Sequence, residues 1–131
     1  DGAGMVFWRR VGLRSAIITA RSSRLLKRRA KELRVDFLAQ KCLLKLLAYE
    51  RLLKRLRVSG EEVCAIGDDL MDLPLLRRAG FAVAVPNAVE EVKAVAHYVT
   101  RRAGGRGAVR EVIDIILKAK GLWDEVLQRY Q

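Results

Sequence analysis

Residues 63–74 read Val-Cys-Ala-Ile-Gly-Asp-Asp-Leu-Met-Asp-Leu-Pro, and this stretch decides the fold class. Its short apolar run predicts a buried strand, and the glycine and aspartates behind the run mark the point where the strand ends. Four further strand-like runs, rich in Ile, Val and Ala, occupy residues 15–19, 35–40, 81–85 and 98–100. Stretches with helical spacing separate the first four of the five runs, so strand and helix alternate along the chain.

This alternation predicts an α/β fold with a Rossmann-like parallel sheet and helices on both faces. Parallel neighbours need a crossover connection, and the usual crossover is a helix. The run Phe81-Ala82-Val83-Ala84-Val85 is apolar throughout, as expected of a strand that is buried on both sides. No internal repeat, low-complexity tract or linker divides the sequence, so we expect one domain over residues 1–131.

Local signals place the ends of several helices. Ser22 or Ser23 is a suitable cap for a helix over the residues that follow. A second helix begins in the Leu-rich stretch around Lys45, and a third runs through residues 109–116 and is closed by Gly121. The aromatic tail, residues 123–130, is expected to pack over an exposed edge or a neighbouring subunit.

The composition excludes several classes of protein. Hydrophobic residues make up 51% of the 131 positions, which is too many for a disordered chain. The apolar runs fall far short of the roughly 18 residues that a membrane-spanning helix needs. No secretory signal can be read, so we expect a cytoplasmic protein without a membrane partner. Two cysteines without a CxxC pair and a single histidine indicate neither a disulfide framework nor a zinc site.

The charge is strongly positive, with 26 Lys and Arg against 15 Asp and Glu and a net charge of +11. Such a chain is attracted to anionic partners. The basic residues are spread through the predicted helices, and the aromatic residues are not grouped as a platform on which bases could stack. A solvated helical surface accounts for the charge better than a nucleic-acid groove does, so we expect no nucleic-acid partner.

Three carboxylates gather within five positions after the strand of residues 63–67. In a doubly wound sheet, ligands lie beyond the carboxyl ends of the strands. Asp68, Asp69 and Asp72 repel one another unless a cation offsets their charge, and Mg²⁺ prefers one or two carboxylates with water and phosphate oxygens. A polar turn in which one Asp caps the next helix explains one carboxylate but not three. We therefore expect a metal site here.

Two more segments point to a phosphate group. Thr19, Ala20 and Arg21 follow the first strand and place a hydroxyl and a cation at the start of a helix, where an anion is favoured. Capping of that helix by Ser22 or Ser23 explains part of the same pattern. Lys45 stands in the first turn of a helix, where the helix dipole disfavours a cation unless a phosphate or Asp69 lies opposite.

In combination, these segments resemble the haloacid dehalogenase-like phosphohydrolases. Residues 19–21, Lys45, and residues 67–69 with Asp72 match the second, third and fourth motifs of that superfamily. Within it, the whole chain is similar to the cap-less group of 3-deoxy-D-manno-octulosonate 8-phosphate phosphatases. The matching segments are residues 1–4, 17–21, 29–33, 66–74 and 104–111.

The resemblance implies that a sugar-acid phosphomonoester is hydrolysed through a covalent aspartyl phosphate, with Mg²⁺ as the cofactor. The reaction would belong to lipopolysaccharide precursor synthesis. The resemblance makes Asp68 a metal ligand and gives Asp72 a place in the metal's shell. It assigns Asp69 the task of holding Lys45, and both are then catalytic residues.

The resemblance also assigns the substrate contacts. Thr19, Ala20 and Lys45 would bind the phosphoryl oxygens, and Arg21 would face the substrate entrance. The group forms homotetramers in which a Gly-rich C-terminal segment helps to close an active site. Arg106 and Arg110 would therefore contact the carboxylate of the sugar acid or the subunit interface, since either role suits a guanidinium.

One part of the family pattern is absent from residues 1–131. The nucleophile and general acid of the family lie in an Asp-x-Asp-Gly motif at the end of its first strand, ahead of the segment that residues 1–4 match. The resemblance puts that strand at the centre of the sheet, between the strand ending at Thr19 and the strand ending at Gly67. Without it, the chain is expected either to re-pair its strands or to leave two inner edges open.

Three functional hypotheses remain open at this stage. The first is a phosphoric monoester hydrolase that is inactive alone and active only when the missing strand is present. The second is a catalytically inactive remnant that keeps metal or phosphate binding, or only the oligomer interface. The third is a basic nucleic-acid-binding module, which the net charge alone supports.

Overall fold

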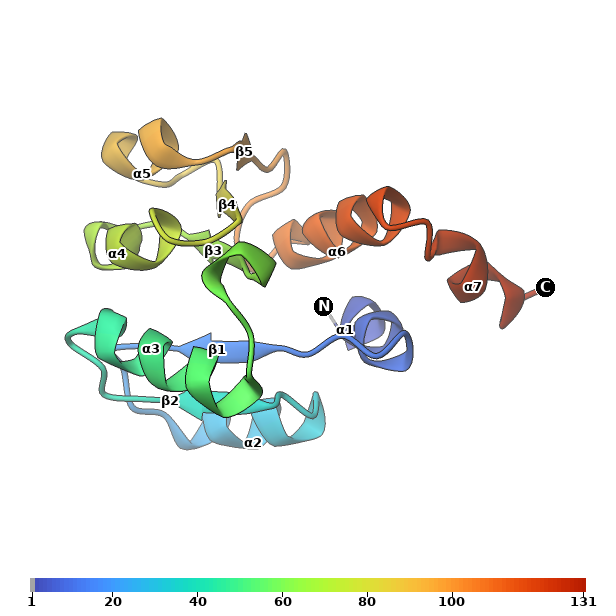
Figure 1. The fold of residues 1–131 in the computed structure, drawn as a ribbon, viewed down its shortest axis with the longest axis horizontal. Helices are drawn as coiled ribbons and strands as arrows, with labels where there is room; N and C mark the ends of the chain where they lie inside the picture. The colour runs from blue at the N-terminus through green and yellow to red at the C-terminus, as the bar shows by residue number, and fades with distance from the viewer. Residues whose placement is uncertain (1) are drawn as a thin grey trace.

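The computed structural model describes residues 2–131 and shows strands and helices in alternation (Figure 1). Asp1, the first residue of the segment 1–4, lies outside the described residues. The strands are β1 (Ala16–Ile18), β2 (Phe37–Ala39), β3 (Cys64–Gly67), β4 (Phe81–Ala84) and β5 (Tyr98–Val99). The helices are α1 (Gly2–Arg10), α2 (Arg24–Glu32), α3 (Lys45–Leu56), α4 (Leu73–Leu76), α5 (Glu90–Val95), α6 (Ala108–Ala119) and α7 (Trp123–Gln128).

The expected α/β architecture is confirmed, and each of the five apolar runs contains a strand. Every strand pair that forms is parallel: β1 pairs with β2, β3 with β4, and β4 with β5. The strands are shorter than the apolar runs, because a strand is hydrogen-bonded only as far as its neighbouring strand extends. The register of β1 and β2, for example, joins only three residue pairs, from Ala16 with Phe37 to Ile18 with Ala39.

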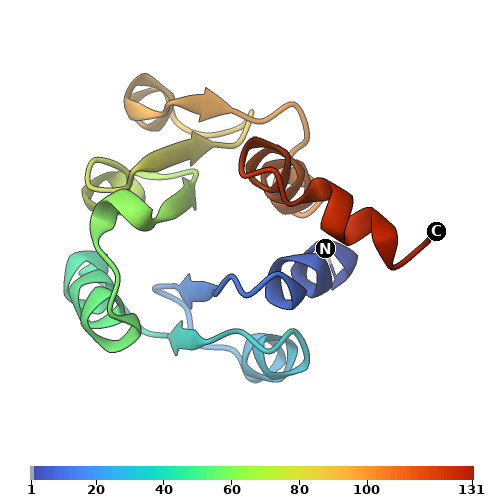
Figure 2. The ribbon, with the colours of Figure 1, turned by 45° about the vertical axis from the view of Figure 1, so that its right-hand side comes forward.

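The strands form two separate sheets, one with the order β1-β2 and one with the order β3-β4-β5. Both views place β1 and β3 at the inner edges of the two sheets (Figures 1 and 2). No ladder joins these two strands within the described part of the chain. Of the two outcomes expected for a sheet without its central strand, the structure shows open inner edges and not re-paired strands.

Three apolar clusters hold the elements in place. The first lies between the three-stranded sheet, α4, α5 and the start of α6, and includes Ala82, Ala84 and Val92. The second packs α3 against the two-stranded sheet through Phe37, Tyr49 and Leu52. The third joins α1 to α6 and α7 around Leu117, which is fully buried. Two contacts therefore hold the two sheets together: that of α3 with α4 in the middle of the chain, and that of α1 with α6 near its two ends.

The crossing of α1 and α6 is unusually close. Gly4 is buried, and a Cβ at this position would stand 3.0 Å from Cδ of Arg110 and 3.2 Å from Cδ1 of Ile113. A glycine lets the backbone of one helix approach the side chains of the other. This crossing is the point at which the N-terminal helix meets the C-terminal half of the molecule.

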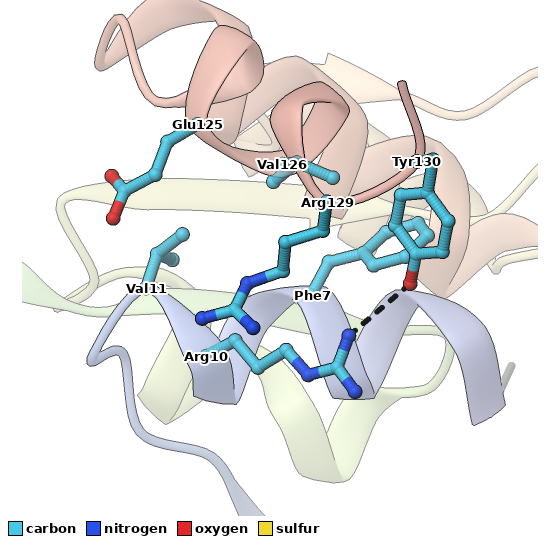
Figure 3. A pocket seen from close by; sticks show the side chains of 7 residues that line it. All are labelled: Phe7, Arg10, Val11, Glu125, Val126, Arg129 and Tyr130. Atoms are coloured by element: carbon cyan, nitrogen blue, oxygen red, sulfur yellow. Dashed lines mark hydrogen bonds between the residues drawn. The ribbon is translucent and has the colours of Figure 1, made fainter.

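The aromatic tail packs on the chain itself. Trp123 meets Phe7 of α1 edge to face at 6.5 Å, and Tyr130 meets the same ring at 5.9 Å. Arg10 donates a hydrogen bond from Nη1 to the hydroxyl oxygen of Tyr130 at the rim of a cavity of about 10 Å³ (Figure 3). The tail thus covers α1 and does not cover a sheet edge.

Local signals account for the helix ends. Ser23 caps α2, and its Oγ accepts a hydrogen bond from the backbone N–H of Leu26 at 3.1 Å. Gly121 follows α6 with a φ of +72°, a left-handed conformation that glycine adopts without strain. None of the helices within residues 2–131 has the length and apolar composition needed to cross a bilayer.

Candidate active site

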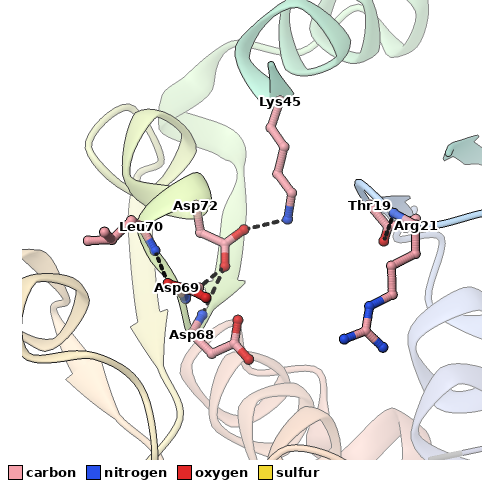
Figure 4. Close-up of polar contacts among 7 residues, drawn as sticks. All are labelled: Thr19, Arg21, Lys45, Asp68, Asp69, Leu70 and Asp72. Carbon is pink, nitrogen blue, oxygen red and sulfur yellow. Dashed lines mark hydrogen bonds and ion pairs between the residues drawn. The ribbon is translucent and has the colours of Figure 1, made fainter. Parts of the chain in front are cut away.

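The three aspartates lie on a turn that leaves the carboxyl end of β3. After Gly67 the chain enters a 3-10 helix, Leu70–Asp72, which leads into α4. Asp69 caps this helix, since its Oδ1 accepts a hydrogen bond from the N–H of Leu70 at 2.7 Å. The tight turn directs Asp72 back toward β3 and leaves Asp68 and Asp69 exposed (Figure 4).

Asp72 is the buried member of the three. Its Oδ1 lies 2.6 Å from Nζ of Lys45, and its Oδ2 accepts hydrogen bonds from the N–H groups of Asp68 at 2.9 Å and Asp69 at 3.2 Å. Burial by itself raises the pKa of Asp72, but the hydrogen bonds from Lys45 and the two backbone N–H groups outweigh it and lower the pKa. The carboxylate therefore stays charged, and both of its oxygens are in use.

Gly67 permits this close approach. A Cβ on Gly67 would stand 2.6 Å from Cβ of Asp72, a separation that real Cβ contacts do not reach. Any side chain here would push Asp72 out of the turn. The sequence showed this glycine only as the end of a strand, and its spatial role depends on the fold.

The ion pair differs from the expected one. The resemblance assigns Lys45 to Asp69, but in the structure Lys45 pairs with Asp72. The reason is geometric: as the cap of the 3-10 helix, Asp69 points toward Leu70, and Asp72 is turned inward toward the start of α3. In the structure Lys45 is therefore joined to Asp72 and not to Asp69, and the catalytic role of Asp69 stays a prediction.

Asp68 is exposed, and its carboxylate lies next to that of Asp72. Burial and the neighbouring charge of Asp72 raise its pKa, and Lys45 lowers it by a smaller amount. No group of three or more His, Cys, Asp or Glu that could hold a metal ion exists within residues 2–131. Mg²⁺ is commonly held by one or two carboxylates together with water and phosphate oxygens. Asp68 fits as the carboxylate ligand of such a site, in which water and phosphate supply the other ligands. Asp72 as a ligand stays a prediction.

The segment Thr19–Arg21 faces this turn from the other sheet. Lys45 lies between Asp72 on one side and Thr19 with Arg21 on the other (Figure 4). The Oγ1 of Thr19 accepts a hydrogen bond from the N–H of Arg21 at 3.1 Å, and the carbonyl of Thr19 accepts one from the N–H of Cys42. These bonds give residues 19–21, Ala20 included, a fixed loop at the end of β1. Their phosphate contacts remain a prediction.

The two C-terminal arginines lie in different surroundings. Arg106 is exposed in the glycine-rich loop before α6. Arg110 is half-buried, since its Nε lies 2.8 Å from Oδ1 of Asp114 and its guanidinium covers the ring of Phe7 at 4.7 Å. Arg110 therefore fastens α1 to α6. A contact of either arginine with a substrate or a subunit stays a prediction.

Sequence reasoning missed one residue that shapes this region. Glu111 accepts hydrogen bonds from the hydroxyl of Tyr98 and from the N–H groups of Arg101 and Arg102, and so fixes the loop that follows β5. Burial alone raises the pKa of Glu111, but these hydrogen bonds and the charge of Arg101 lower it overall. A glutamate in the first turn of a helix was the available signal, but its partners come from a strand and a loop elsewhere in the sequence.

Comparison with known proteins gives a consistent result. A family model described as haloacid dehalogenase-like hydrolase matches residues 35–113. The 3-deoxy-D-manno-octulosonate 8-phosphate phosphatase of Escherichia coli (strain K12) is 42% identical over 125 residues, which cover 95% of this chain and 66% of that protein. The Yersinia pestis phosphatase of the same name is 50% identical over 105 residues, 80% of this chain and 56% of that protein.

A solved structure gives the same picture. The 3-deoxy-D-manno-octulosonate 8-phosphate phosphatase of Moraxella catarrhalis, in complex with a magnesium ion, a phosphate ion and a KDO molecule, superposes with a TM-score of 0.96 at 44% identity. The match covers all of this chain and 75% of that one. The chain thus spans about two thirds or less of the length of these two curated relatives.

Proposed function

This chain belongs to the haloacid dehalogenase-like hydrolases, and from that premise we propose that it forms the phosphate-handling part of a magnesium-dependent phosphatase. The proposed substrate is the phosphomonoester of a sugar acid of the 3-deoxy-D-manno-octulosonate 8-phosphate type, used in lipopolysaccharide precursor synthesis. Support comes from relatives of that name and from the likeness over the whole chain to a structure that holds Mg²⁺, phosphate and KDO.

One observation carries this proposal: the ammonium of Lys45 is fixed by Asp72 near the exposed carboxylate of Asp68. A cation held next to a carboxylate at the end of parallel strands suits a phosphoryl group, whose oxygens the cation attracts. Lys45 and Thr19 would bind these oxygens, with Ala20 lining the loop. Arg21 would stand at the entrance, and Arg106 would contact the carboxylate of the sugar acid.

Asp68 would contribute one oxygen to Mg²⁺, and the ion, when bound, supplies charge neutralisation at the phosphoryl group. The ion pair with Lys45 leaves Asp72 to orient the turn: its Oδ2 fixes the N–H groups of Asp68 and Asp69, which sets the direction of the Asp68 side chain. Asp72 is therefore proposed to support the metal site through Asp68.

The bond-breaking step needs a nucleophile that residues 1–131 do not contain, since the family's Asp-x-Asp-Gly motif does not occur among them. We place it on a strand that pairs with both inner edges, β1 and β3. A parallel strand there would end beside Thr19, Lys45 and Asp68, because the carboxyl ends of parallel strands meet at one edge of a sheet. Hydrolysis is thus proposed for the chain joined to such a strand.

The test is to extend the chain at its N-terminus with a family-like strand that ends in Asp-x-Asp-Gly. Mg²⁺-dependent release of inorganic phosphate from 3-deoxy-D-manno-octulosonate 8-phosphate is then expected, at a level far above that of the unextended chain. The Asp68→Asn variant should abolish the release, and Glu32→Gln, a surface change, should leave it intact. No release from the extended chain, or unchanged release from Asp68→Asn, would contradict the proposal.

The second candidate is a non-catalytic relative that keeps its metal or phosphate affinity. Phosphate release from a generic phosphomonoester should then stay at background. Mg²⁺ with inorganic phosphate should still raise the melting temperature, because a ligand that binds only the folded state stabilises it. The shift should disappear in Asp68→Asn and persist in Glu32→Gln.

Association with further copies of the chain is the third part of the proposal. Leu43, Leu44 and Leu47, around the first turn of α3, are 78%, 71% and 61% exposed, and Leu70 beside the aspartates is 53% exposed. Exposed leucines around a site are typical of a surface that a partner covers. Light scattering should show an oligomer, a tetramer by resemblance, and the change of Leu43 and Leu47 to Gln should shift it toward the monomer.

A further inference from the structure

The positive charge is concentrated in one segment of the chain, residues 21–57. Residues 21–57 contain 13 of the 26 Lys and Arg but only 3 of the 15 Asp and Glu, so this segment carries +10 of the net charge of +11. It comprises the loop after β1, then α2, β2 and α3. The remainder of the chain is almost neutral, and the total charge does not reveal this division.

On α2 the cations form a single stripe. Arg24, Lys27, Arg28 and Lys31 are all exposed, and their spacing puts them on one face of the helix. At 1.5 Å per residue the stripe is about 10 Å long. The ion pair on α2 joins Arg29 to Glu32, which lie beside the stripe. Within the described residues, none of the four cations of the stripe forms an ion pair with a carboxylate.

On α3 three more cations surround an open groove of about 260 Å³. Arg51, Lys54 and Arg55 line it together with Phe37, which is buried at its base. The guanidinium of Arg55 lies 6.0 Å from the centre of the Phe37 ring, a contact that favours a fixed position for the cation. None of the three takes part in an ion pair with a carboxylate of residues 2–131.

The two clusters lie on the two helices that accompany the two-stranded sheet. Helix α3 packs on one face of the two-stranded sheet, and α2 lies on its other side, with β2 as the outer strand (Figure 2). We define the basic surface as Arg24, Lys27, Arg28 and Lys31 of α2 with Arg51, Lys54 and Arg55 of α3. It is separate from the ion pair of Lys45 and Asp72, which lies at the inner side of α3.

We propose that the basic surface binds the phosphate backbone of a nucleic-acid duplex. Unpaired cations spread over two helices complement a ligand that repeats its negative charge, and neutralised phosphates release counterions, which drives such binding. This proposal departs from the expectation of no nucleic-acid partner, because the structure shows that these cations of α2 and α3 have no carboxylate partner within residues 2–131 and that three of them line one groove.

Two other anionic partners fit less well. The aromatic residues within 21–57 are Phe37 and Tyr49, and both are buried, so no ring is available to stack an unpaired base of a single strand. A membrane-surface helix inserts an apolar face, but Leu26 and Ala30 of α2 turn into the protein. Leu25 alone is an exposed apolar residue in α2. The phosphate backbone of a duplex therefore fits the cations of α2 better than these two ligands do, and the exposed leucines at the start of α3 make anionic lipid the alternative that the experiment must distinguish.

Fluorescence anisotropy of a labelled 20-base-pair DNA duplex, over a salt series from about 50 to about 200 mM, tests the proposal. The intact chain should bind, and its affinity should fall steeply with salt. Changing Arg51, Lys54 and Arg55 together to Gln should weaken binding about 10-fold and reduce the salt slope by about 2 to 3. The matched control changes Arg77, Lys120 and Arg129 to Gln, which removes the same charge elsewhere and should alter affinity less than about 2-fold.

Each alternative outcome has its own signature. Equal losses from the two triple variants would show that only the overall charge acts, and would overturn the proposal. So would the absence of duplex binding at low salt, or binding to vesicles of anionic lipid in preference to the duplex. A variant with Arg51→Lys, Lys54→Arg and Arg55→Lys should retain binding, and thermal melting should show that all variants fold.

Discussion

Nζ of Lys45 and Oδ1 of Asp72 lie 2.6 Å apart and join α3 of the two-stranded half to the turn after β3 of the three-stranded half. The two side chains are only 13% and 11% exposed. The pair is thus a largely buried contact between two sheets that share no strand ladder. Lys45 is thus both a candidate phosphate-binding residue and part of the contact between the two sheets. The contribution of the ion pair to stability can be measured without measuring activity.

Loss of the carboxylate of Asp72 should destabilise the protein. Asp72→Asn leaves the Lys45 ammonium without its charge partner in a buried setting, which should cost about 2 to 4 kcal/mol of the free energy of unfolding in urea. The control is Glu32→Gln, which removes the exposed pair with Arg29 and should cost less than about 0.5 kcal/mol. Equal losses in the free energy of unfolding for the two variants would show that the Lys45–Asp72 pair stabilises the protein no more than an exposed ion pair does.

A methyl group on Gly67 should be poorly tolerated. The added Cβ of Gly67→Ala would collide with Cβ of Asp72, so the turn must shift, at an expected cost of about 1 to 3 kcal/mol. Gly104→Ala is a matched control, because its Cβ would meet only Cγ1 of Val85 at 3.9 Å. Thermal melting distinguishes the two, and a melting temperature for Gly67→Ala equal to that of Gly104→Ala would contradict the close packing.

Glu111 should make stability depend on pH on the acid side. Its folded pKa is lower than the ordinary value of 4.5, so the charged form stabilises the fold above that value and the benefit is lost as the pH falls through the lowered folded pKa. Glu111→Gln should therefore be less stable than the parent near neutral pH. The gap should shrink in urea titrations below about pH 4, and a gap independent of pH would refute this account.

The cluster that joins α1, α6 and α7 should depend on Leu117. This side chain is fully buried, so Leu117→Ala removes contacts on all sides and should cost about 2 to 5 kcal/mol in the free energy of unfolding. Leu43→Ala, at a position 78% exposed, should change it by less than about 0.5 kcal/mol. Chemical denaturation of both variants, under conditions where the chain is monomeric, provides the comparison.

Much of the secondary structure could be predicted because its causes are local. Ser23 caps α2, a left-handed Gly121 follows α6, and each apolar run contains a strand, since backbone propensity and hydrophobic period act within a few residues. The fold class follows from the same signals, because alternation of strand and helix permits few arrangements.

The pairing within the site could not be predicted, because it depends on contacts between distant residues. Three aspartates in five positions indicate a site, but which of them meets Lys45 is decided by the 3-10 turn and by the missing side chain of Gly67. The hydrogen bonds of Glu111 likewise appear only when the chain is folded.

The glycine at the α1–α6 crossing has a further consequence for the distant site. Helix α1 leads into the strand that ends at Thr19, and α6 belongs to the half that carries Asp68. We therefore expect the close approach of the two helices at Gly4 to influence the separation between the hydroxyl of Thr19 and the carboxylate of Asp68. A larger side chain at position 4 is expected to push α1 away from α6 and so to change the distance between the two sheets at the site.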